Sequence, residues 1–404
     1  MNVKTLIFRS PLYSSTIIEE FKTPNNVTFI GSSIFKGITT LKTVKLSDSV
    51  TTISSSCFYG CTKLISINLA NVTDVYGEAF ANCSSLTSID LGKVTAFDGQ
   101  TDSGIDGYCA AFVNCTNLKD VELSSSLKYL GAYMFKNCTS LESITLPSSL
   151  GLIEPHTFEG CSSLATIDLS YVTKFGESAL YGTAIGNDVL ENLNTSVTEL
   201  PSHIFYNCSN ITKFVIPANI TTIGSRILSY TNIEELTIPA TVTTLSDGCV
   251  GQFANIPVKT LTIDAGSPLT YWPLQFINGM EITEIELPVA LESLGYASLN
   301  ALRYLETIIV RNTTKVINFP DDVDDGNAFG KSSVEYGNNC AGSLVEGDKV
   351  LYVPAQLVDA YQADTTDGQT LADDGSNKNY WKTVLIDICK FKVVGLDENG
   401  NIPN

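Results

Sequence analysis

Residues 135–147 read Phe-Lys-Asn-Cys-Thr-Ser-Leu-Glu-Ser-Ile-Thr-Leu-Pro, and they are one copy of a phrase that recurs over most of the chain. The cysteines alone show the period. Cys115, Cys138 and Cys161 are 23 residues apart, and Cys61 and Cys83 are 22 apart. A repeat of this length is typical of a solenoid, in which each unit packs only on its neighbours. The sequence therefore predicts one repeat domain rather than several globular ones.

The strand half of each repeat follows the pattern Leu-x-x-Ile-x-Leu. A second apolar phrase comes after it, as in residues 49–53, and leads to the aromatic residue of the next turn, such as Phe58. Period-two alternation predicts that strand positions four and six point inward and positions three and five point outward. An additional copy is expected at Val3, and residues 351–354 close the series. The regular copies begin at Leu41, Leu64, Leu86, Leu118, Leu141, Leu164, Ile211, Ile233, Val258, Ile282 and Leu305.

These features predict a strand-dominated α/β solenoid. We expect a right-handed superhelix with one parallel β-sheet face, short helical or 3-10 turns, and some thirteen or fourteen coils of roughly 23 residues. The solenoid should occupy residues 1–345, with an N-terminal cap or first coil at 1–30 and a loop insertion near 96–109. The last strand and a C-terminal cap should occupy 346–404.

Composition excludes some partners. The chain has 43 acidic and 24 basic side chains and a net charge of -19, which disfavours nucleic acid and anionic membrane surfaces. No stretch approaches the roughly 18 apolar residues needed to span a bilayer. The first apolar run, residues 5–8, is short for a signal peptide and resembles a strand. Either an export signal has been removed or the protein is cytosolic.

The repeat signature resembles that of the BspA-like leucine-rich repeat family: an aromatic residue, then Asn or Gly, Cys and Thr or Ser, followed by the strand phrase. The resemblance covers about residues 27 to 320 and extends to a closing segment with Tyr361 and residues 380–382. It implies a leucine-rich repeat fold and a surface or secreted protein of a host-associated microbe, with a role in adhesion. Complete copies occur at Phe58, Phe80, Phe112, Phe135, Phe158 and Phe205.

Six of the eleven cysteines occupy one repeat position, so they should form one stacked interior column. We interpret them as buried free thiols rather than disulfides or metal ligands, because the chain has no CxxC cluster and an odd number of cysteines. Disulfides between coils remain the alternative. The column consists of Cys61, Cys83, Cys115, Cys138, Cys161 and Cys208.

Catalytic and cofactor chemistry have little support. His156 and His203 are the only histidines, and each precedes a repeat aromatic, so both should lie on equivalent turns two coils apart. Acidic stretches at 321–325 and 364–374 fail the calcium-loop pattern. Asparagine sequons such as Asn137 coincide with the cysteine column and follow from the repeat itself. We therefore expect no enzyme, no metal and no cofactor.

The outward strand positions define a hydroxyl-rich face with acidic residues and without aromatic ones. Such a face suits a basic partner, although Thr, Ser and acidic residues also keep an exposed sheet soluble. Aromatic residues are expected instead in loops and turns. The acidic candidates on the face are Asp90, Asp120, Glu122, Asp168, Glu235, Glu284 and Glu286, and the loop candidates are Asp102, Asp106, Tyr108, Tyr271 and Trp272.

Three functions are compatible with this pattern. The first is a monomeric, surface-displayed or secreted protein that adheres to a host or bacterial protein through the solenoid surface. The second is a glycan-binding module, for which Tyr271 and Trp272 would supply the ring platform. The third is an intracellular protein-binding scaffold, which the free cysteines favour.

Overall fold

The computed structural model describes residues 17–25, 27–97, 109–245, 251–295, 298–299, 301–317, 349–362 and 391–403. It divides into two compact units. Unit 1 comprises Met1–Val197 and His203–Asn210, and unit 2 comprises Thr198–Ser202 and Ile211–Asn404. Several predictions lie outside the described residues: the strand at Val3, the acidic stretches, and Asp102, Asp106, Tyr108 and residues 380–382. Three of the eleven cysteines, Cys249, Cys340 and Cys389, also lie outside them.

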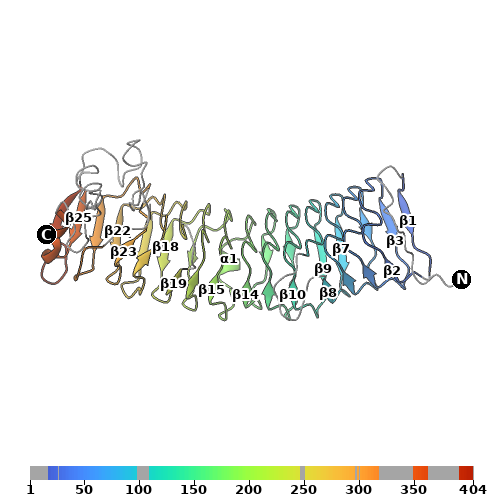
Figure 1. Ribbon diagram of the computed structural model, residues 1–404, viewed down its shortest axis with the longest axis horizontal. Coiled ribbons are helices and arrows are strands. Elements are labelled where there is room, and N and C mark those ends of the chain that lie inside the picture. The colour runs from blue at the N-terminus through green and yellow to red at the C-terminus, as the bar shows by residue number, and fades with distance from the viewer. Residues whose placement is uncertain are drawn as a thin grey trace, which may run out of the picture. The chain divides into compact units, whose positions relative to one another are not determined.

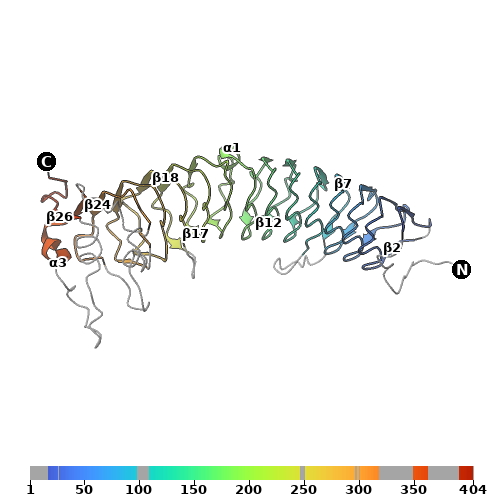
Figure 2. The ribbon, with the colours of Figure 1, turned by 90° about the horizontal axis from the view of Figure 1, so that it is seen from above.

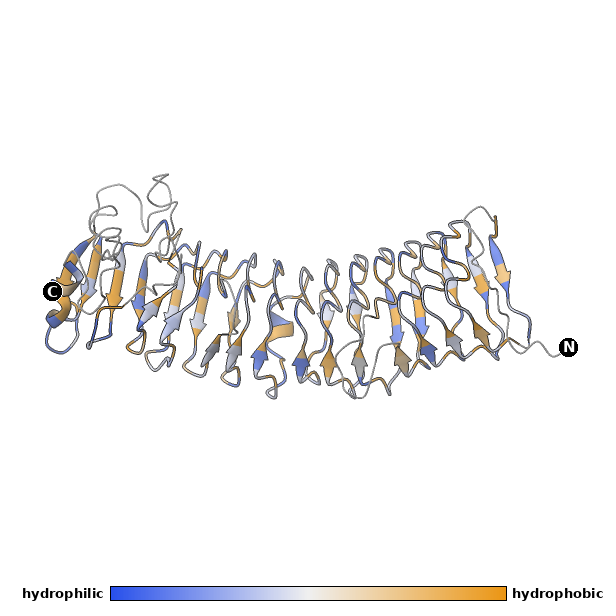
Figure 3. Cartoon of the chain, in the orientation of Figure 1, coloured by the Kyte–Doolittle hydropathy of each residue, from blue (hydrophilic) through white to orange (hydrophobic). Residues whose placement is uncertain are grey.

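The strand phrase forms parallel strands in unit 1, which pair in three short sheets and which we together call the first ladder, with coils stacked side by side (Figures 1 and 2). Pairing joins equivalent positions of successive copies, so Asp90 lies opposite Glu122 and Ser88 opposite Asp120. Polar and apolar residues alternate along these strands, as Figure 3 shows. This first ladder contains β1 (Glu20–Lys22), β3 (Thr43–Lys45), β5 (Ser66–Ile67), β7 (Ser88–Leu91), β9 (Asp120–Leu123), β11 (Ser143–Ile144) and β13 (Thr166–Ile167).

The second apolar phrase of each repeat also forms parallel strand pairs. Each coil therefore contributes to two ladders rather than to one sheet face. In unit 1 the second ladder consists of β2 (Phe29–Ile30), β4 (Thr52–Ile53), β6 (Asp74–Val75), β8 (Ala96–Phe97), β10 (Tyr129–Leu130), β12 (Leu152–Ile153) and β14 (Lys174–Phe175).

One coil has a helix where the others have a first-ladder strand. The strand phrase is missing between the copies at Leu164 and Ile211, and α1 (Asn187–Leu190) stands in its place (Figure 1). Val189 and Leu190 of this helix are buried. The helix therefore supplies the apolar side chains that a strand would otherwise direct into the core.

Unit 2 repeats the same arrangement with strands of both ladders. Its first ladder contains β16 (Phe214–Val215), β18 (Glu235–Ile238), β20 (Thr260–Ile263), β22 (Glu284–Leu287), β24 (Thr307–Val310), β25 (Val350–Val353) and β26 (Lys392–Gly395). Its second ladder contains β15 (Glu199–Leu200), β17 (Thr222–Ile223), β19 (Thr244–Leu245), β21 (Tyr271–Trp272) and β23 (Ser293–Leu294).

The predicted parallel-strand solenoid is confirmed, with about twelve turns instead of thirteen or fourteen. The difference arises near the end of the chain. In the described residues, β24, β25 and β26 continue the first ladder without second-ladder partners. A 3-10 helix η1 (Ala355–Leu357) and α3 (Val358–Gln362) follow β25, and the hydroxyl of buried Tyr361 accepts a hydrogen bond from the Ile317 N–H at 3.2 Å. The predicted domain boundary at 345/346 stays a prediction.

The turns of unit 1 are held by a stack of buried phenylalanines and a column of thiols beside it. Neighbouring rings are 5.2 to 5.7 Å apart between centroids and tilted by 10° or less. Each column thiol donates to the carbonyl oxygen of the residue at the aromatic position one coil earlier, as Cys83 Sγ does to Phe58 at 3.1 Å. At Cys208 that position is Leu180, whose carbonyl accepts the bond at 3.2 Å. The thiol thus links adjacent coils as well as filling the core. The stacked rings are Phe35, Phe58, Phe80, Phe112, Phe135 and Phe158.

Each turn needs a left-handed residue just before the cysteine position, which asparagine and glycine tolerate best. The asparagines at this place form their own ladder. Asn114 Nδ2 donates to Asn82 Oδ1 and Asn137 Nδ2 donates to Asn114 Oδ1, both at 2.9 Å. Gly160, with φ +73°, ends the ladder because it has no side-chain amide, and a Cβ there would collide with Oδ1 of Asn137. The Asn114 and Asn137 amides are therefore already used within the fold.

Candidate interaction surface

A shallow groove of about 340 Å³ lies on the first-ladder face of unit 1, across β7, β9 and β11. Asp90, Asp120 and Glu122, three of the acidic residues predicted for this face, line it. Strand alternation directs all three side chains outward, and the parallel register brings Asp90 opposite Glu122 on adjacent strands. The structure therefore gathers into one place residues that are 30 positions apart in the chain.

The carboxylates of this groove have no counter-ion in the described part of the chain. Lys119 lines the same groove, but no ion pair joins it to an acidic side chain there. Like charges directly opposite on paired strands are destabilising. Three acidic groups in a concave surface produce a negative potential that a basic partner could neutralise.

Asp90 and Asp168 also have a local structural role that sequence reasoning missed. Asp90 Oδ1 accepts a hydrogen bond from the Gly92 N–H at 2.8 Å, and Asp168 Oδ1 accepts one from the Ser170 N–H at 2.9 Å. Hydrogen bonds from the backbone and side chain of Ser170 hold the pKa of the Asp168 carboxyl below its usual value. Asn68 makes the same turn with Ala70.

A sequence signal for this turn exists. Position seven of the phrase is often proline, as at Pro147, but proline has no N–H to donate. Asp or Asn occupies position five in copies where position seven is Ala70, Gly92 or Ser170. Aspartate at position five followed two residues later by a non-proline residue therefore indicates an Asx turn as well as a charged surface.

The acidic candidates of unit 2 lie in a different electrostatic setting. Arg311 binds both carboxylate oxygens of Glu286, with Nε at 2.8 Å and Nη2 at 3.2 Å. This pairing raises the pKa of Arg311 above its ordinary value. Glu284 lies on the same strand as Glu286, and Glu235 is exposed on β18. Ile309, expected outside at position five of β24, is instead buried.

The predicted aromatic platform at Tyr271 and Trp272 is wrong for the tryptophan. Both residues lie in strand β21 rather than in a loop, and alternation turns Tyr271 outward, where it is 43% exposed. Trp272 is fully buried and packs on Phe276 with ring centroids 4.9 Å apart. A two-ring platform for a sugar therefore does not form here.

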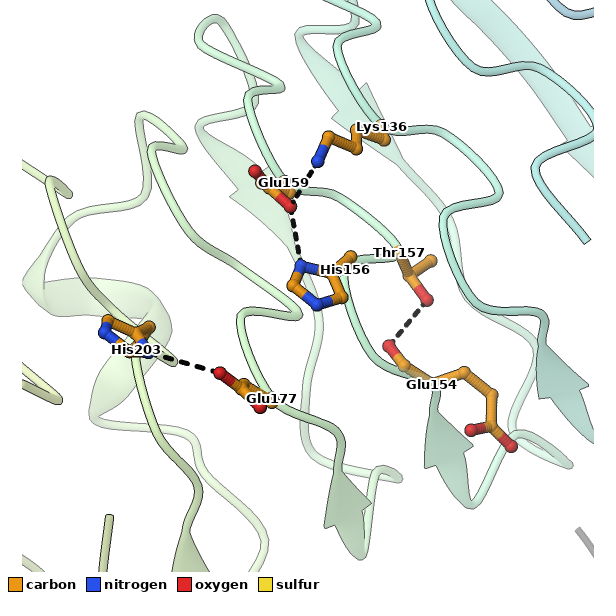
Figure 4. Close-up of polar contacts among 7 residues, drawn as sticks. All are labelled: Lys136, Glu154, His156, Thr157, Glu159, Glu177 and His203. Atoms are coloured by element: carbon orange, nitrogen blue, oxygen red, sulfur yellow. Dashed lines mark hydrogen bonds and ion pairs between the residues drawn. The ribbon is translucent and has the colours of Figure 1, made fainter. Parts of the chain in front are cut away.

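The two histidines lie on equivalent turns, as Figure 4 shows, with φ of 59° at both. His156 Nδ1 is 2.6 Å from Glu159 Oε2, and Lys136 Nζ is 2.9 Å from the same oxygen. His203 Nδ1 is 3.4 Å from Glu177 Oε1. Both imidazoles therefore belong to charged clusters that connect neighbouring coils.

Aromatic rings accompany these histidines, which the sequence pattern did not reveal. His156 stacks on Tyr133 at 4.5 Å, and Tyr181 stacks on Tyr206 at 4.7 Å between ring centroids. Nearby, the Thr157 hydroxyl donates to the Glu154 carbonyl at 2.8 Å, and burial raises the pKa of the Glu154 carboxyl. The two ring pairs, each formed between neighbouring coils, stabilise the stack of coils along the turns that carry the histidines.

Nucleophilic chemistry at the cysteine column is disfavoured by burial. The eight cysteines in the described residues are all free and buried. Burial raises the pKa of Cys61, Cys115 and Cys161 to about 12 and that of Cys208 to about 11. A thiol reacts as its thiolate, so these groups are poor nucleophiles near neutral pH.

The described residues contain neither a metal-binding cluster nor a membrane-spanning helix. No cluster of three or more His, Cys, Asp or Glu side chains there could hold a metal ion. No helix in that part of the chain is long and apolar enough to cross a membrane.

Comparison with known proteins identifies both repeat and fold. The family model of the BspA type leucine rich repeat region matches in six copies, over residues 7–101, 108–192 and 189–257. A leucine-rich repeat protein from Bacteroides ovatus is 22% identical, with a TM-score of 0.52 and coverage of 72% of each chain. A leucine rich cell surface protein from Faecalibacterium prausnitzii is 21% identical, with a TM-score of 0.52 and coverage of 74% of this chain and 84% of that one. A search of curated proteins found no match.

Proposed function

Since this chain belongs to the BspA-type leucine-rich repeat family, we propose that it is a non-enzymatic protein that binds a protein partner through the first-ladder face of unit 1. Proteins of this family and fold are generally interaction proteins without catalytic activity. Display at the cell surface or secretion, and adhesion to a host or bacterial protein, are parts of the same proposal. The resemblance to cell-surface leucine-rich repeat proteins supports both the localisation and the adhesion role.

The observation that carries the proposal is the acidic groove over β7, β9 and β11. Asp120 and Glu122 are exposed there and lack counter-ions in the described residues. Solenoids commonly use an extended strand face for binding, since it presents side chains from many coils at once. A basic protein surface would supply the missing counter-charges.

The two alternative functions have weaker support. Glycan binding is weakened because Trp272 is buried in the core, which leaves Tyr271 as the one exposed ring of the predicted pair. The intracellular scaffold was favoured by free cysteines, but burial shields the eight described thiols from oxidants in any compartment. We therefore place surface adhesion to a protein first.

The test compares the full chain with an Asp120→Asn, Glu122→Gln variant. Both proteins are immobilised and exposed to host secretions and to a glycan array, and retained proteins are quantified by mass spectrometry. We expect a protein retained by the original chain to be depleted roughly tenfold on the variant. Asp168→Asn is the matched control, because it removes a charge from the same face but keeps the turn acceptor.

Glycan binding without a retained protein would overturn the proposal. Equal retention by the variant would also contradict it, because the groove would then have no part in binding.

A further inference from the structure

The exposed side chains at position five of the first-ladder strands in unit 1 change from positive to negative charge along successive coils. Position five of successive first-ladder copies is occupied by Lys22, Lys45, Asn68, Asp90 and Glu122, a set that we call the charge column. All five residues are exposed. Lys22 lies directly opposite Lys45, and Asp90 lies directly opposite Glu122. Two like-charged pairs of opposite sign are therefore separated by one neutral residue.

This arrangement is unfavourable for the fold alone. Like charges on directly opposed strand positions destabilise a sheet, and no ion pair involves the charged members of the column in the described residues. The same two coils show that pairing was geometrically available. At position two, Lys42 Nζ binds Glu19 Oε2 across the coils at 2.9 Å. Among the residues that the structure describes, the column lacks this compensation, and its charges are therefore open to a binding partner.

The spacing defines what such a partner must offer. Strands lie about 4.8 Å apart, so Lys45 and Asp90 are separated by about 10 Å and the ends of the column by about 19 Å. An extended segment of about six residues spans that length. The screening length is about 8 Å at physiological salt, so the two ends attract charges independently. The acidic end opens into the groove, since Asp90 and Glu122 line it.

We propose that the charge column binds an extended protein segment of two signs, with acidic side chains over Lys22 and Lys45 and basic side chains over Asp90 and Glu122. This inference rests on the proposed function and specifies its partner. A purely basic ligand would gain at one end of the column and be repelled at the other. The bipolar segment gains at both ends.

The test uses synthetic peptides and the full chain. One labelled peptide carries three lysines and three glutamates separated by two glycines, a second carries three lysines only, and a third is neutral. Affinity is measured by fluorescence anisotropy at physiological salt. We expect the bipolar peptide to bind best, and each of two variants to weaken it roughly three- to tenfold: Lys22→Gln with Lys45→Gln, and Asp90→Asn with Glu122→Gln. Asn at position 90 retains the turn acceptor, as Asn68 does naturally.

A charge reversal provides the second arm. Lys22→Glu with Lys45→Glu makes both ends of the column negative, so the lysine-only peptide should now bind better than the bipolar one. Asp168→Asn is the control and should leave the affinities unchanged. Circular dichroism establishes that every variant is folded.

The outcomes separate the two proposals. If the lysine-only peptide binds the original chain as well as the bipolar one, and the lysine substitutions have no effect, the bipolar inference is wrong while groove binding stands. If proteins from host secretions are retained through Asp120 and Glu122 but the column variants change the affinity of none of the three peptides, the column is also excluded as the binding site. If the original chain retains no protein that the Asp120→Asn, Glu122→Gln variant loses, and it binds none of the peptides, the proposed function itself is wrong.

Discussion

The turns of unit 1 and unit 2 differ in how their buried polar groups are satisfied. In unit 1, Cys138 Sγ bonds the Phe112 carbonyl at 3.3 Å, and the same donor recurs in successive coils. In unit 2, the cysteine position is aliphatic in several coils, as at Ile256 and Leu302, and the phrase is less regular. The buried side-chain polar atoms that lack a partner among the described residues all lie there, in Thr241, Gln252, Ser267, Trp272 and Ser298.

This difference shows what repetition contributes. When a copy stacks on a near-identical copy, one residue supplies a donor where the same position one coil away supplies an acceptor. A substitution that removes a donor or acceptor in one copy therefore requires a compensating substitution in the neighbouring copy. Where that compensation is missing, a buried donor or acceptor loses its partner, and the loss costs about 1–3 kcal/mol per group.

The largest expected effect comes from breaking the ring stack. Phe135→Ala should destabilise the protein by about 3–5 kcal/mol, because it removes a buried ring stacked on both sides. Phe253→Ala in unit 2 should cost about 1 kcal/mol less, because Phe253 has one ring neighbour among the described residues, Phe276, where Phe135 has two. Urea unfolding followed by circular dichroism measures both. Equal losses would mean that stacking adds nothing to cavity formation.

Alkaline pH should weaken unit 1 through its thiols. Burial raises the pKa of Cys61, Cys115 and Cys161 from 9.0 to about 12. Their stabilising contribution is complete below pH 9, because both states are then protonated, and it is lost as the pH rises from 9 towards 12 and only the unfolded thiols ionise. At pH 10 the loss is about 1.4 kcal/mol per thiol, or about 4 kcal/mol for the three.

Urea unfolding at pH 8 and pH 10 tests this linkage. The variant with Cys61→Ala, Cys115→Ala and Cys161→Ala should be less stable at pH 8 but should lose less stability between the two pH values. The same pH dependence in both proteins would refute the thiol assignment.

Repairing one unsatisfied group should stabilise unit 2. Gln252 is fully buried, and neither its amide nitrogen nor its oxygen has a partner in the described residues. Gln252→Met keeps the shape and should raise stability by about 1–2 kcal/mol. The matched change in unit 1, Thr157→Val, should lower it by about 1 kcal/mol, because the Thr157 hydroxyl bonds the Glu154 and Gly131 carbonyls. Calorimetric melting decides, and a loss of stability in Gln252→Met would contradict the comparison.

The smallest effects distinguish the exposed acidic residues of the two units. Asp168→Asn should change stability by less than about 0.5 kcal/mol at any salt concentration, since asparagine keeps the acceptor for Ser170. Glu286→Gln should cost about 0.2–1 kcal/mol at low salt through loss of the Arg311 pair, and less at 1 M salt. Chemical unfolding at both salt concentrations measures this, and a salt-independent Glu286 effect would exclude an ionic origin.

Much of the fold could be predicted because its signals are local and repeated. The cysteine spacing predicts the coil, and the alternation at Ile89, Asp90 and Leu91 predicts which side chains enter the core. The helix α1 could be anticipated only as a missing strand phrase. Trp272 was misjudged because the second phrase was not recognised as a paired strand, so its alternation was not applied.

The candidate site was predicted in part. Sequence position identified Asp90, Asp120 and Glu122 as outward residues, but the groove itself depends on how three coils stack. The Asx turn at Asp90 and the Arg311 pair with Glu286 show that similar acidic residues have different surroundings. These surroundings depend on side-chain directions and on residues many positions away.

The sequence by itself determined the repeat, the strand phrase, the buried positions and the family, because a short apolar period is a local property and the same pattern recurs in every copy. Only the tertiary structure decided which charges remain unpaired, which rings cover one another and where the thiols donate. Those outcomes depend on contacts between residues about one coil apart, where a shift of a few ångströms separates a hydrogen bond from an exposed charge. The turn phrase at residues 135–147 thus specifies the coil, and its neighbours decide what each of its polar groups does.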